Sequence, residues 1–206
     1  MTCAHCCYRC TAQGVDMSQE VYQAALMLAA DTDANIAIGG GEPTVHPLFW
    51  QFLGEALGCG VEYVWLATNG KVTNTAIALA GLAKGSELLS VSLSQDEFHE
   101  PIEQRVIDTF RHASLELRNV SDHLVNAGRA KDNELGGDSR HCACPGIIVK
   151  PNGDIYPCGC EDAPKIGNVL KGGITKHYKK IIATEEFSDC ECWSEYKLTV
   201  KENADG

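Results

Sequence analysis

Residues 1–10 read Met1-Thr2-Cys3-Ala4-His5-Cys6-Cys7-Tyr8-Arg9-Cys10, which places four thiols within eight positions. Four cysteines this close together cannot all be ordinary residues of an apolar core. Thiolates are strong metal ligands. We therefore interpret this segment, called the cysteine loop below, as a metal-binding loop. The rest of the chain is expected to fold around whatever the loop binds.

Cysteine is also the unusual feature of the whole composition, with 11 residues in a chain of 206. Cys59 stands alone in an apolar stretch and is predicted to be a small buried hydrophobe. The others are grouped as Cys3, Cys6, Cys7 and Cys10, then Cys142 and Cys144, Cys158 and Cys160, and Cys190 and Cys192. In a reducing compartment, clustered cysteines indicate metal ligands rather than disulfides.

The net charge and the hydrophobicity of the chain argue against two classes of partner, nucleic acids and membranes. The net charge of -11 argues against binding to nucleic acid or to anionic membranes, both of which need a basic surface. No apolar run approaches the roughly 18 residues that span a bilayer, and the polar N-terminus does not have the pattern of a signal peptide. We therefore expect a cytoplasmic protein with no nucleic-acid or membrane partner.

Strand and helix patterns alternate along the first two thirds of the chain. Predicted helices cover residues 17–30, 47–57, 73–83 and 101–110, the first with a capping box at Asp16 and Gln19. Predicted strands cover 35–39, 61–68 and 88–93, with 115–120 as a strand or helix tail and 124–127 as a short strand. This alternation predicts an α/β fold with a parallel sheet and helical crossovers.

Polar and glycine-rich segments follow the predicted strands. They are Gly40–Pro43, Thr68–Gly70 and Ser92–Asp96. In parallel α/β sheets, ligands bind at the carboxyl ends of the strands, so these segments are expected to form one site.

The C-terminal third has a different pattern. Residues 131–141 have the composition of a linker, and Pro151-Asn152-Gly153 separates two short apolar runs at 147–150 and 154–156. Asn-Gly between such runs predicts a β-hairpin. We therefore divide the chain into residues 1–135 and a cysteine-rich region at 136–206.

Four motifs occur together in the N-terminal part. Cys3, Cys7 and Cys10 have the spacing CxxxCxxC, and three thiolates on a short loop can bind three irons of a [4Fe–4S] cluster and leave the fourth iron open. A GGEP loop, a Thr-Asn-Gly turn and Ser92-Leu93-Ser94 with Asp96-Glu97-Phe98-His99 follow at successive strand ends. In this order, they make residues 3–130 similar to the radical S-adenosylmethionine (radical SAM) enzymes.

The resemblance implies a partial (β/α) barrel of the radical SAM type, abbreviated and lacking the first strand. It implies an enzyme that reductively cleaves S-adenosylmethionine (SAM) at a [4Fe–4S] cluster, forming a 5′-deoxyadenosyl radical that abstracts hydrogen from a substrate. The substrate class expected by analogy is a peptide or a small molecule in cofactor maturation. An electron donor such as flavodoxin or ferredoxin would be the partner.

The resemblance also suggests which residues contact SAM. These are Gly40, Gly41, Glu42, Pro43, Asn69, Ser92, Ser94 and Arg129. Glycines allow the backbone to approach a ligand closely, and Arg129 is suited to a carboxylate. His99 is a weaker candidate for a substrate-facing catalytic residue, and the sequence assigns no other catalytic group.

Two registers of the cluster ligands remain open. In one, Cys3, Cys7 and Cys10 are the ligands. In the other, Cys3-Ala4-His5-Cys6 is the second half of a Cys-Asn-x-x-Cys-x-His-Cys pattern, and the first ligand would precede Met1. A third interpretation is a zinc site that uses His5 as a fourth ligand.

The C-terminal cysteines have a similar resemblance of their own. Ten residues separate Cys142 from Gly153, and four more separate Gly153 from Cys158, as in SPASM or twitch extensions. Six cysteines suffice for one four-thiolate auxiliary [4Fe–4S] cluster: Cys142, Cys144, Cys158, Cys160, Cys190 and Cys192. The alternatives are a structural zinc knuckle and, for the whole chain, a non-catalytic iron–sulfur, zinc-binding or electron-transfer module.

Overall fold

A computed structural model of the chain describes residues 2–31, 34–119, 124, 126–136, 147–157, 159, 163 and 165–172. The N-terminal elements are α1 (Gln19–Asp31), β1 (Ile36–Ile38), the 3-10 helix η1 (Pro43–Val45), α2 (Phe49–Gly58), β2 (Val64–Thr68), α3 (Thr73–Lys84), β3 (Leu89–Ser94), α4 (Gln104–His112), β4 (Leu117–Arg118) and α5 (Gly128–Asp132). The later elements are β5 (Ile148–Val149), β6 (Asp154–Tyr156), β7 (Gly167–Asn168) and the 3-10 helix η3 (Val169–Lys171).

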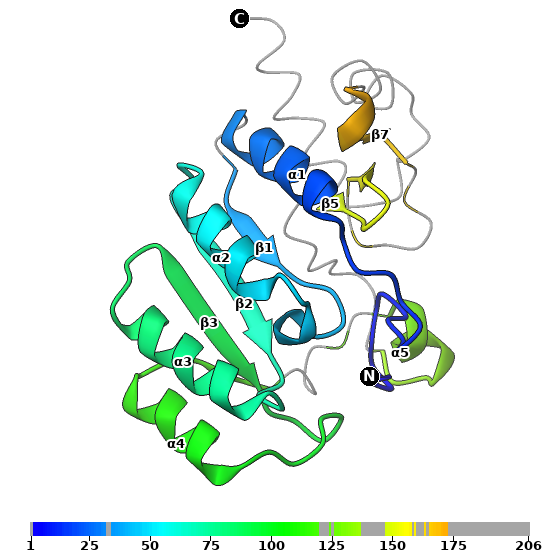
Figure 1. Cartoon of the computed structure of the whole chain (residues 1–206). Helices are drawn as coiled ribbons and strands as arrows, with labels where there is room; N and C mark the ends of the chain where they lie inside the picture. The colour runs from blue at the N-terminus through cyan, green and yellow to red at the C-terminus, as the bar shows by residue number, and fades with distance from the viewer. Residues whose placement is uncertain are drawn as a thin grey trace, which may run out of the picture.

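Four strands form a parallel sheet in the order β1-β2-β3-β4, which confirms the predicted α/β class with a parallel sheet (Figure 1). Ile36 is opposite Val64, Val64 is opposite Leu89, and Leu93 is opposite Leu117. Strand order thus follows chain order, and α2, α3 and α4 lie on one face of the sheet (Figure 1). A doubly wound sheet would instead reverse its strand order and place helices on both faces.

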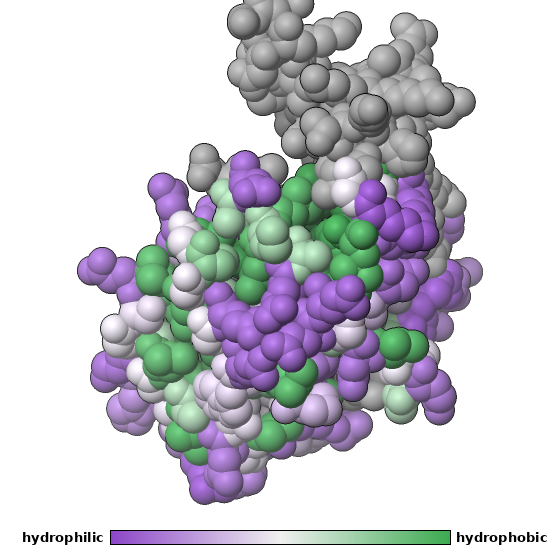
Figure 2. Space-filling model, turned by 45° about the horizontal axis from the view of Figure 1, so that its top comes forward, coloured by the Kyte–Doolittle hydropathy of each residue, from purple (hydrophilic) through white to green (hydrophobic). Residues whose placement is uncertain are grey.

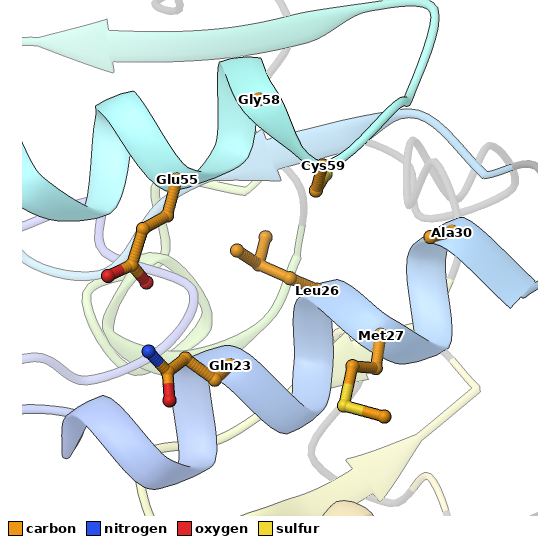
Figure 3. Close-up of a pocket in the computed structure, with 7 residues that line it drawn as sticks. All are labelled: Gln23, Leu26, Met27, Ala30, Glu55, Gly58 and Cys59. Carbon is orange, nitrogen blue, oxygen red and sulfur yellow. The ribbon is translucent and has the colours of Figure 1, made fainter.

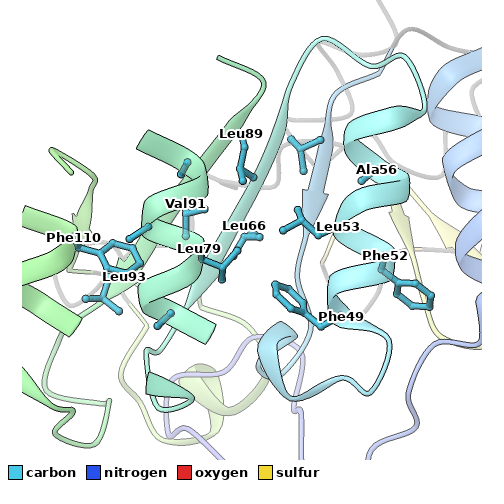
Figure 4. Close-up of a cluster of buried hydrophobic side chains, with 14 of the residues drawn as sticks. Phe49, Phe52, Leu53, Ala56, Leu66, Leu79, Leu89, Val91, Leu93 and Phe110 are labelled. Carbon is cyan, nitrogen blue, oxygen red and sulfur yellow. The ribbon is translucent and has the colours of Figure 1, made fainter. Parts of the chain in front are cut away.

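The core fills the space between these helices and the sheet (Figure 4). Leu66 and Val91 are fully buried on the strands, and Leu79 and Phe110 meet them from α3 and α4. Because side chains alternate along a strand, Trp65 and Ser92 belong to the opposite face, where they hydrogen-bond to each other. Among the described residues, no helix covers this face, which is called the helix-free face below. Trp65 and Ser92 make it the more polar one.

Helix α1 packs on α2 through aromatic contacts. The Tyr22 and Phe52 rings stack with centroids 4.0 Å apart, and the Tyr22 hydroxyl donates to the Phe52 carbonyl oxygen at 2.7 Å. The N-terminal cap is Ser18, whose Oγ accepts from the Val21 amide at 3.3 Å. The predicted capping box was therefore misplaced, because Ser18 lies directly before the helix and Gln19 within it.

Several element boundaries differ from the predictions. Helix α4 begins at Gln104 rather than Pro101, and the segment at 115–120 is a strand over Leu117–Arg118 rather than a helix tail. No strand is formed at 126–127, the described end of the short strand predicted at 124–127, and α5 follows directly. The predicted linker at 131–141 begins inside α5, which ends at Asp132.

The predicted hairpin is present as β5 and β6, which pair antiparallel with Val149 opposite Ile155. A third strand, β7, pairs with β6. Asn168 on β7 closes the turn, since its Nδ2 donates to the Asn152 carbonyl oxygen at 3.0 Å and to Asp154 Oδ1 at 2.8 Å. Gly153 has φ +80, and a Cβ there would lie 3.1 Å from the Asn168 amide, so the turn requires glycine.

The surface is mixed. Figure 2 shows hydrophilic side chains over much of the visible face, with apolar side chains in several patches among them. Among the described residues, no helix has the length and apolar character needed to cross a membrane.

Candidate functional site

The cysteine loop is held by α5, from more than 100 residues further along the chain. Arg129 Nε donates to the Cys3 carbonyl oxygen at 2.8 Å, and its Nη2 donates to the Cys10 carbonyl oxygen at 2.7 Å. The Arg129 amide also donates to the Cys6 carbonyl oxygen at 3.0 Å. One residue therefore ties three positions of the loop together, and its guanidinium faces loop carbonyls. A contact of Arg129 with a cofactor carboxylate stays a prediction.

Further contacts fix α5 against the loop. Gly128 has φ +55, and a Cβ on it would lie 2.3 Å from the Cys7 carbonyl oxygen. Arg9 forms a bidentate pair with Asp132, and Asn133 Nδ2 donates to the Ala4 carbonyl oxygen at 2.9 Å. The glycine is needed both for its left-handed conformation and for the close approach of the two backbones.

The four thiols of the loop are half-buried and interact electrostatically, with Cys6 at the centre. The Cys6 sulfur accepts from the Cys10 amide at 3.4 Å. The hydrogen bond from the Cys10 side chain, assisted by backbone amides and the Arg129 charge, lowers the pKa of Cys6 to about 5. Burial raises the pKa of Cys3 and of Cys7.

A lowered pKa supplies the deprotonated sulfur that iron and zinc require. Among the described residues, no group of three His, Cys, Asp or Glu side chains is already arranged to hold a metal ion. The loop thus fits a thiolate-bound metal centre by its donor atoms, and the sulfurs must converge when the metal binds.

The glycine loop of residues 39–41 follows β1 and lies beside the cysteine loop. Gly40 has φ +131, a conformation that favours glycine. A Cβ on Gly41 would lie 3.6 Å from Cys10 Cβ. The structure therefore brings together the GGEP motif and the cysteines, which the sequence predicts to share one site.

Glu42 is buried and its carboxylate is fully engaged. Its Oε1 accepts from the Thr44 amide at 3.2 Å, the Thr44 hydroxyl at 2.6 Å and the Thr68 hydroxyl at 2.8 Å. Its Oε2 accepts from the Asn69 amide at 2.8 Å. Glu42 therefore links the end of β1 to the end of β2, while Pro43 begins η1 directly after it. A direct contact of either residue with SAM stays a prediction.

Of the three other predicted SAM-contacting residues, Asn69 directly follows β2, and Ser92 and Ser94 lie in the second half of β3. Asn69 is buried, and its Oδ1 accepts from the Lys71 amide at 2.9 Å. Ser92 is also buried, accepts from Trp65 Nε1 at 3.0 Å and donates to Glu116. Ser94 is the last residue of β3. Ser92 is thus already committed to a hydrogen-bond chain on the helix-free face.

His99 is held by Asp96 in the loop after β3. Its Nδ1 lies 2.7 Å from Asp96 Oδ1, which also accepts from the Phe98 amide at 3.0 Å. His5 of the cysteine loop packs on this segment, with its ring centroid 4.9 Å from that of Phe98 and 5.1 Å from that of His99. Burial lowers the pKa of His5. The predicted candidate His99 is therefore next to the cysteine loop.

A groove of about 490 Å³ between α1 and α2 is lined by residues remote from the cysteine loop (Figure 3). The Glu55 carboxylate and the Gln23 amide come from facing helices, and the Leu26 side chain projects between these helices further along the groove (Figure 3). Cys59 also lines it and is half-buried rather than fully buried as predicted, with its sulfur 3.1 Å from the Ala56 carbonyl oxygen. No predicted site residue lies there, and we assign no function to this groove.

The predicted ligands of the second metal centre all lie outside the described residues: Cys142, Cys144, Cys158, Cys160, Cys190 and Cys192. Gly159 is described, and a Cβ on it would lie 2.9 Å from the Tyr8 hydroxyl. The cysteine loop is therefore close to the chain between two of these cysteines.

Sequence reasoning missed the residues that support the site rather than form it. The Arg9–Asp132 pair and the close approach of Gly128 to Cys7 depend on α5. This helix of 5 residues is too short to leave a periodic signal in the sequence. The contact of His5 with the segment after β3 also has no local signature. A scan against protein-family models finds no match to this chain, and a search of curated proteins also finds none.

Proposed function

We propose that this chain is a radical SAM enzyme, in which the cysteine loop binds a [4Fe–4S] cluster and the glycine loop binds SAM. The observation that supports this most is the proximity of Gly41 to Cys10 after the carboxyl end of β1, where a Cβ on the glycine would be in van der Waals range of Cys10 Cβ. In the proposed enzyme, this proximity places the cofactor loop directly beside the cluster ligands. The helix-free face of the sheet, as in a partial barrel, is the proposed substrate side.

The cysteine loop is suited to the cluster by its chemistry. In one register, Cys3 and Cys6 are ligands together with a first ligand that would precede Met1. In the other, the ligands are Cys3, Cys7 and Cys10. When bound, the cluster supplies the electron that cleaves SAM to methionine and a 5′-deoxyadenosyl radical. The chain positions the reactants and keeps water away from them.

Each supporting residue has a defined task in this proposal. Arg129 holds the carbonyl oxygens of Cys3 and Cys10 through two separate donors and so supports the backbone of the loop. Glu42 keeps the glycine loop in register with the Asn69 turn. A C-terminal auxiliary cluster, a cytoplasmic location and an electron donor such as flavodoxin or ferredoxin are part of the same proposal.

Anaerobic reconstitution with iron and sulfide tests the proposal. The expected result is a [4Fe–4S] absorbance that bleaches with dithionite, together with 5′-deoxyadenosine formed from SAM. Substituting Cys3, which is a ligand in both registers, by alanine should abolish both signals. Separate alanine variants of Cys6 and Cys7 decide the register, because only one of the two should lose the SAM-dependent product. Both variants are made in a chain that also carries the residues preceding Met1, since the Cys3 and Cys6 register takes its first ligand from there.

The second candidate function is a non-catalytic zinc or iron–sulfur module. The observation that favours it is the Nδ1 atom of His5, which is buried beside the thiols and has no hydrogen-bond partner among the described residues. A fourth zinc ligand of this kind would complete a Cys₃His site. Stoichiometric zinc that survives chelation, with no SAM cleavage after iron loading, would favour the module over the enzyme.

A further inference from the structure

Arg118 lies on the helix-free face of the sheet and reaches from β4 to β2. Leu117 packs against the core, so Arg118, the next residue of β4, projects from the opposite face. Its guanidinium carbon lies 5.6 Å from the centroid of the Trp65 ring, within the range of a cation–π interaction. Because β3 lies between β2 and β4, the Arg118 side chain crosses β3 to make this contact. The contact therefore holds the guanidinium over the sheet.

The Trp65 ring is itself fixed by two hydrogen bonds in series. Trp65 Nε1 donates to Ser92 Oγ at 3.0 Å, and the Ser92 hydroxyl donates to the Glu116 carboxylate. Ser92 is fully buried, so this chain of side chains has little freedom to rearrange. A cation that is positioned before its ligand arrives binds that ligand at a lower entropic cost.

The Arg118 guanidinium has N–H groups available for a ligand. A guanidinium carries five donors and no acceptor. Within the described part of the chain, Arg118 contacts the Trp65 ring, and its side chain forms neither a hydrogen bond nor an ion pair. Glu116 is on the same face and accepts from Ser92, but it is not paired with Arg118. The donors of Arg118 are therefore not used by the protein groups that the structure places.

The surroundings of Arg118 connect it to the proposed site. Ala37 on β1 and Ala67 on β2 project from the same face as Trp65, and their side chains are small. The positive charge of Arg118 interacts electrostatically with Cys7 of the cysteine loop. A ligand lying over the two alanines can therefore contact the guanidinium and remain near the loop.

We propose that Arg118, positioned by Trp65, binds a carboxylate group of a ligand on the helix-free face. A guanidinium offers two parallel N–H donors that match the two oxygens of a carboxylate. A phosphate group also fits this fork, but it carries more negative charge, so Glu116 on the same face repels it more strongly. That the carboxylate belongs to the substrate, as an acidic side chain or the C-terminus of a peptide, rests on the proposed function. The binding of a carboxylate does not.

The test is a nuclear magnetic resonance titration of the full chain carrying ¹⁵N-labelled tryptophan, with the Trp65 indole signal assigned from Trp65→Phe. Sodium acetate should shift the Trp65 signal in a saturable way. Acetamide, which has a similar shape and no charge, should shift it at least fivefold less, and sodium chloride at equal ionic strength measures the non-specific effect. Trp50, which is exposed on α2, serves as the internal reference and should not respond.

Substitutions identify the group that binds. Arg118→Gln should abolish the acetate response, and Arg118→Lys should weaken it several-fold, because an ammonium group lacks the fork of donors. Arg111→Gln is the matched control, since it removes the same charge from an exposed position on α4 and should leave the response unchanged. Glu116→Gln keeps an oxygen that can accept from Ser92 and should raise the response to phosphate relative to acetate. A thermal melt of each variant shows whether it is folded.

SAM also carries a carboxylate, and a second titration separates the two sources. It is made after the chain has been loaded anaerobically with iron, sulfide and SAM. If Arg118 binds a carboxylate of the substrate, the acetate response persists in the presence of SAM. Loss of the response when SAM is added would overturn the assignment to the substrate.

Three results would overturn the inference as a whole: an acetate effect matched by sodium chloride, an undiminished response in Arg118→Gln, or a stronger response to phosphate than to acetate. The first titration needs neither a cluster nor SAM. A saturable acetate response without SAM cleavage would therefore leave the carboxylate site standing and remove the proposed function. SAM cleavage without an acetate response would remove this inference alone.

Discussion

Glu42 Oε2 accepts a hydrogen bond from the backbone amide of Asn69 at 2.8 Å, which joins the loop after β1 to the turn after β2. This places the glutamate of the GGEP motif in a supporting position, with its second oxygen engaged by Thr44 and Thr68. The two loops that are proposed to bind SAM are therefore mechanically coupled. A substitution of Glu42 should therefore disturb the conformation of both loops.

Glu42→Gln is expected to lower the free energy of unfolding by about 2 kcal/mol, since hydrogen bonds to a charged group contribute about 1.5–3 kcal/mol each and the amide nitrogen cannot accept. Urea unfolding followed by circular dichroism measures the change. Glu62→Gln is the matched control, because Glu62 is exposed in the loop before β2 and should change stability by less than about 0.5 kcal/mol. Equal effects of the two substitutions would contradict the role given to Glu42.

Gly128→Ala should destabilise the chain by about 2 kcal/mol or more, because the added methyl meets the Cys7 carbonyl oxygen in a left-handed backbone conformation. Iron uptake during reconstitution should fall with it. Gly81→Ala adds the same methyl on the exposed side of α3, where no atom lies within 4 Å, and should stabilise by about 0.5–1 kcal/mol. Thermal melts test this prediction: the melting temperature should fall in Gly128→Ala and rise in Gly81→Ala.

Arg129→Lys should reduce the iron retained per chain several-fold, because a single ammonium group cannot reproduce the two separate donors that reach Cys3 and Cys10. The measurement is the iron content after desalting. Lys131→Ala, an exposed change on the same short helix, is the control and should retain iron. Full iron retention in Arg129→Lys would show that the loop does not need this support.

Metal-free chain should be alkylated at Cys6 before Cys3 or Cys7. The pKa of Cys6 is lowered to about 5, so its thiolate is present above this pH and is lost as the pH falls through it. Burial raises the pKa of Cys3 and of Cys7, so their alkylation should need a higher pH. Iodoacetamide labelling from pH 4 to 9, mapped by mass spectrometry, checks the order.

The Cys10→Ala variant provides the internal test of this order. It removes the side-chain hydrogen bond that is the main cause of the low pKa. The midpoint of Cys6 labelling should therefore move to a higher pH. An unchanged midpoint would show that another group stabilises the thiolate.

The strands of the parallel sheet were predictable from the sequence, because their burial requires a recognisable pattern of apolar residues. Leu66 and Val91 sit in apolar runs bounded by turn residues, and such runs identify strands without reference to the rest of the chain. The placement of the glycine loop at a strand end follows from the same pattern. Where the signal is periodic, the prediction was sound.

Two kinds of feature were not predictable: helix boundaries and contacts between distant residues. Ser18 caps α1 only because the helix begins at Gln19, and the sequence pattern does not define the first residue of a helix. The engagement of Glu42 by Thr68 and the contact of His5 with Phe98 join segments far apart in sequence. A single sequence contains no information on such pairs beyond residue type.

The dependence of the cysteine loop on α5 has a consequence for synthesis. Cys3 and Arg129 are 126 positions apart, so the loop leaves the ribosome long before the residue that secures it. At translation rates of about 5–20 residues per second, that interval is roughly 6–25 seconds. During it the thiols are open to oxidation or to the wrong metal. In the proposed enzyme, stable insertion of the cluster would therefore have to wait until the polypeptide has been made through Arg129.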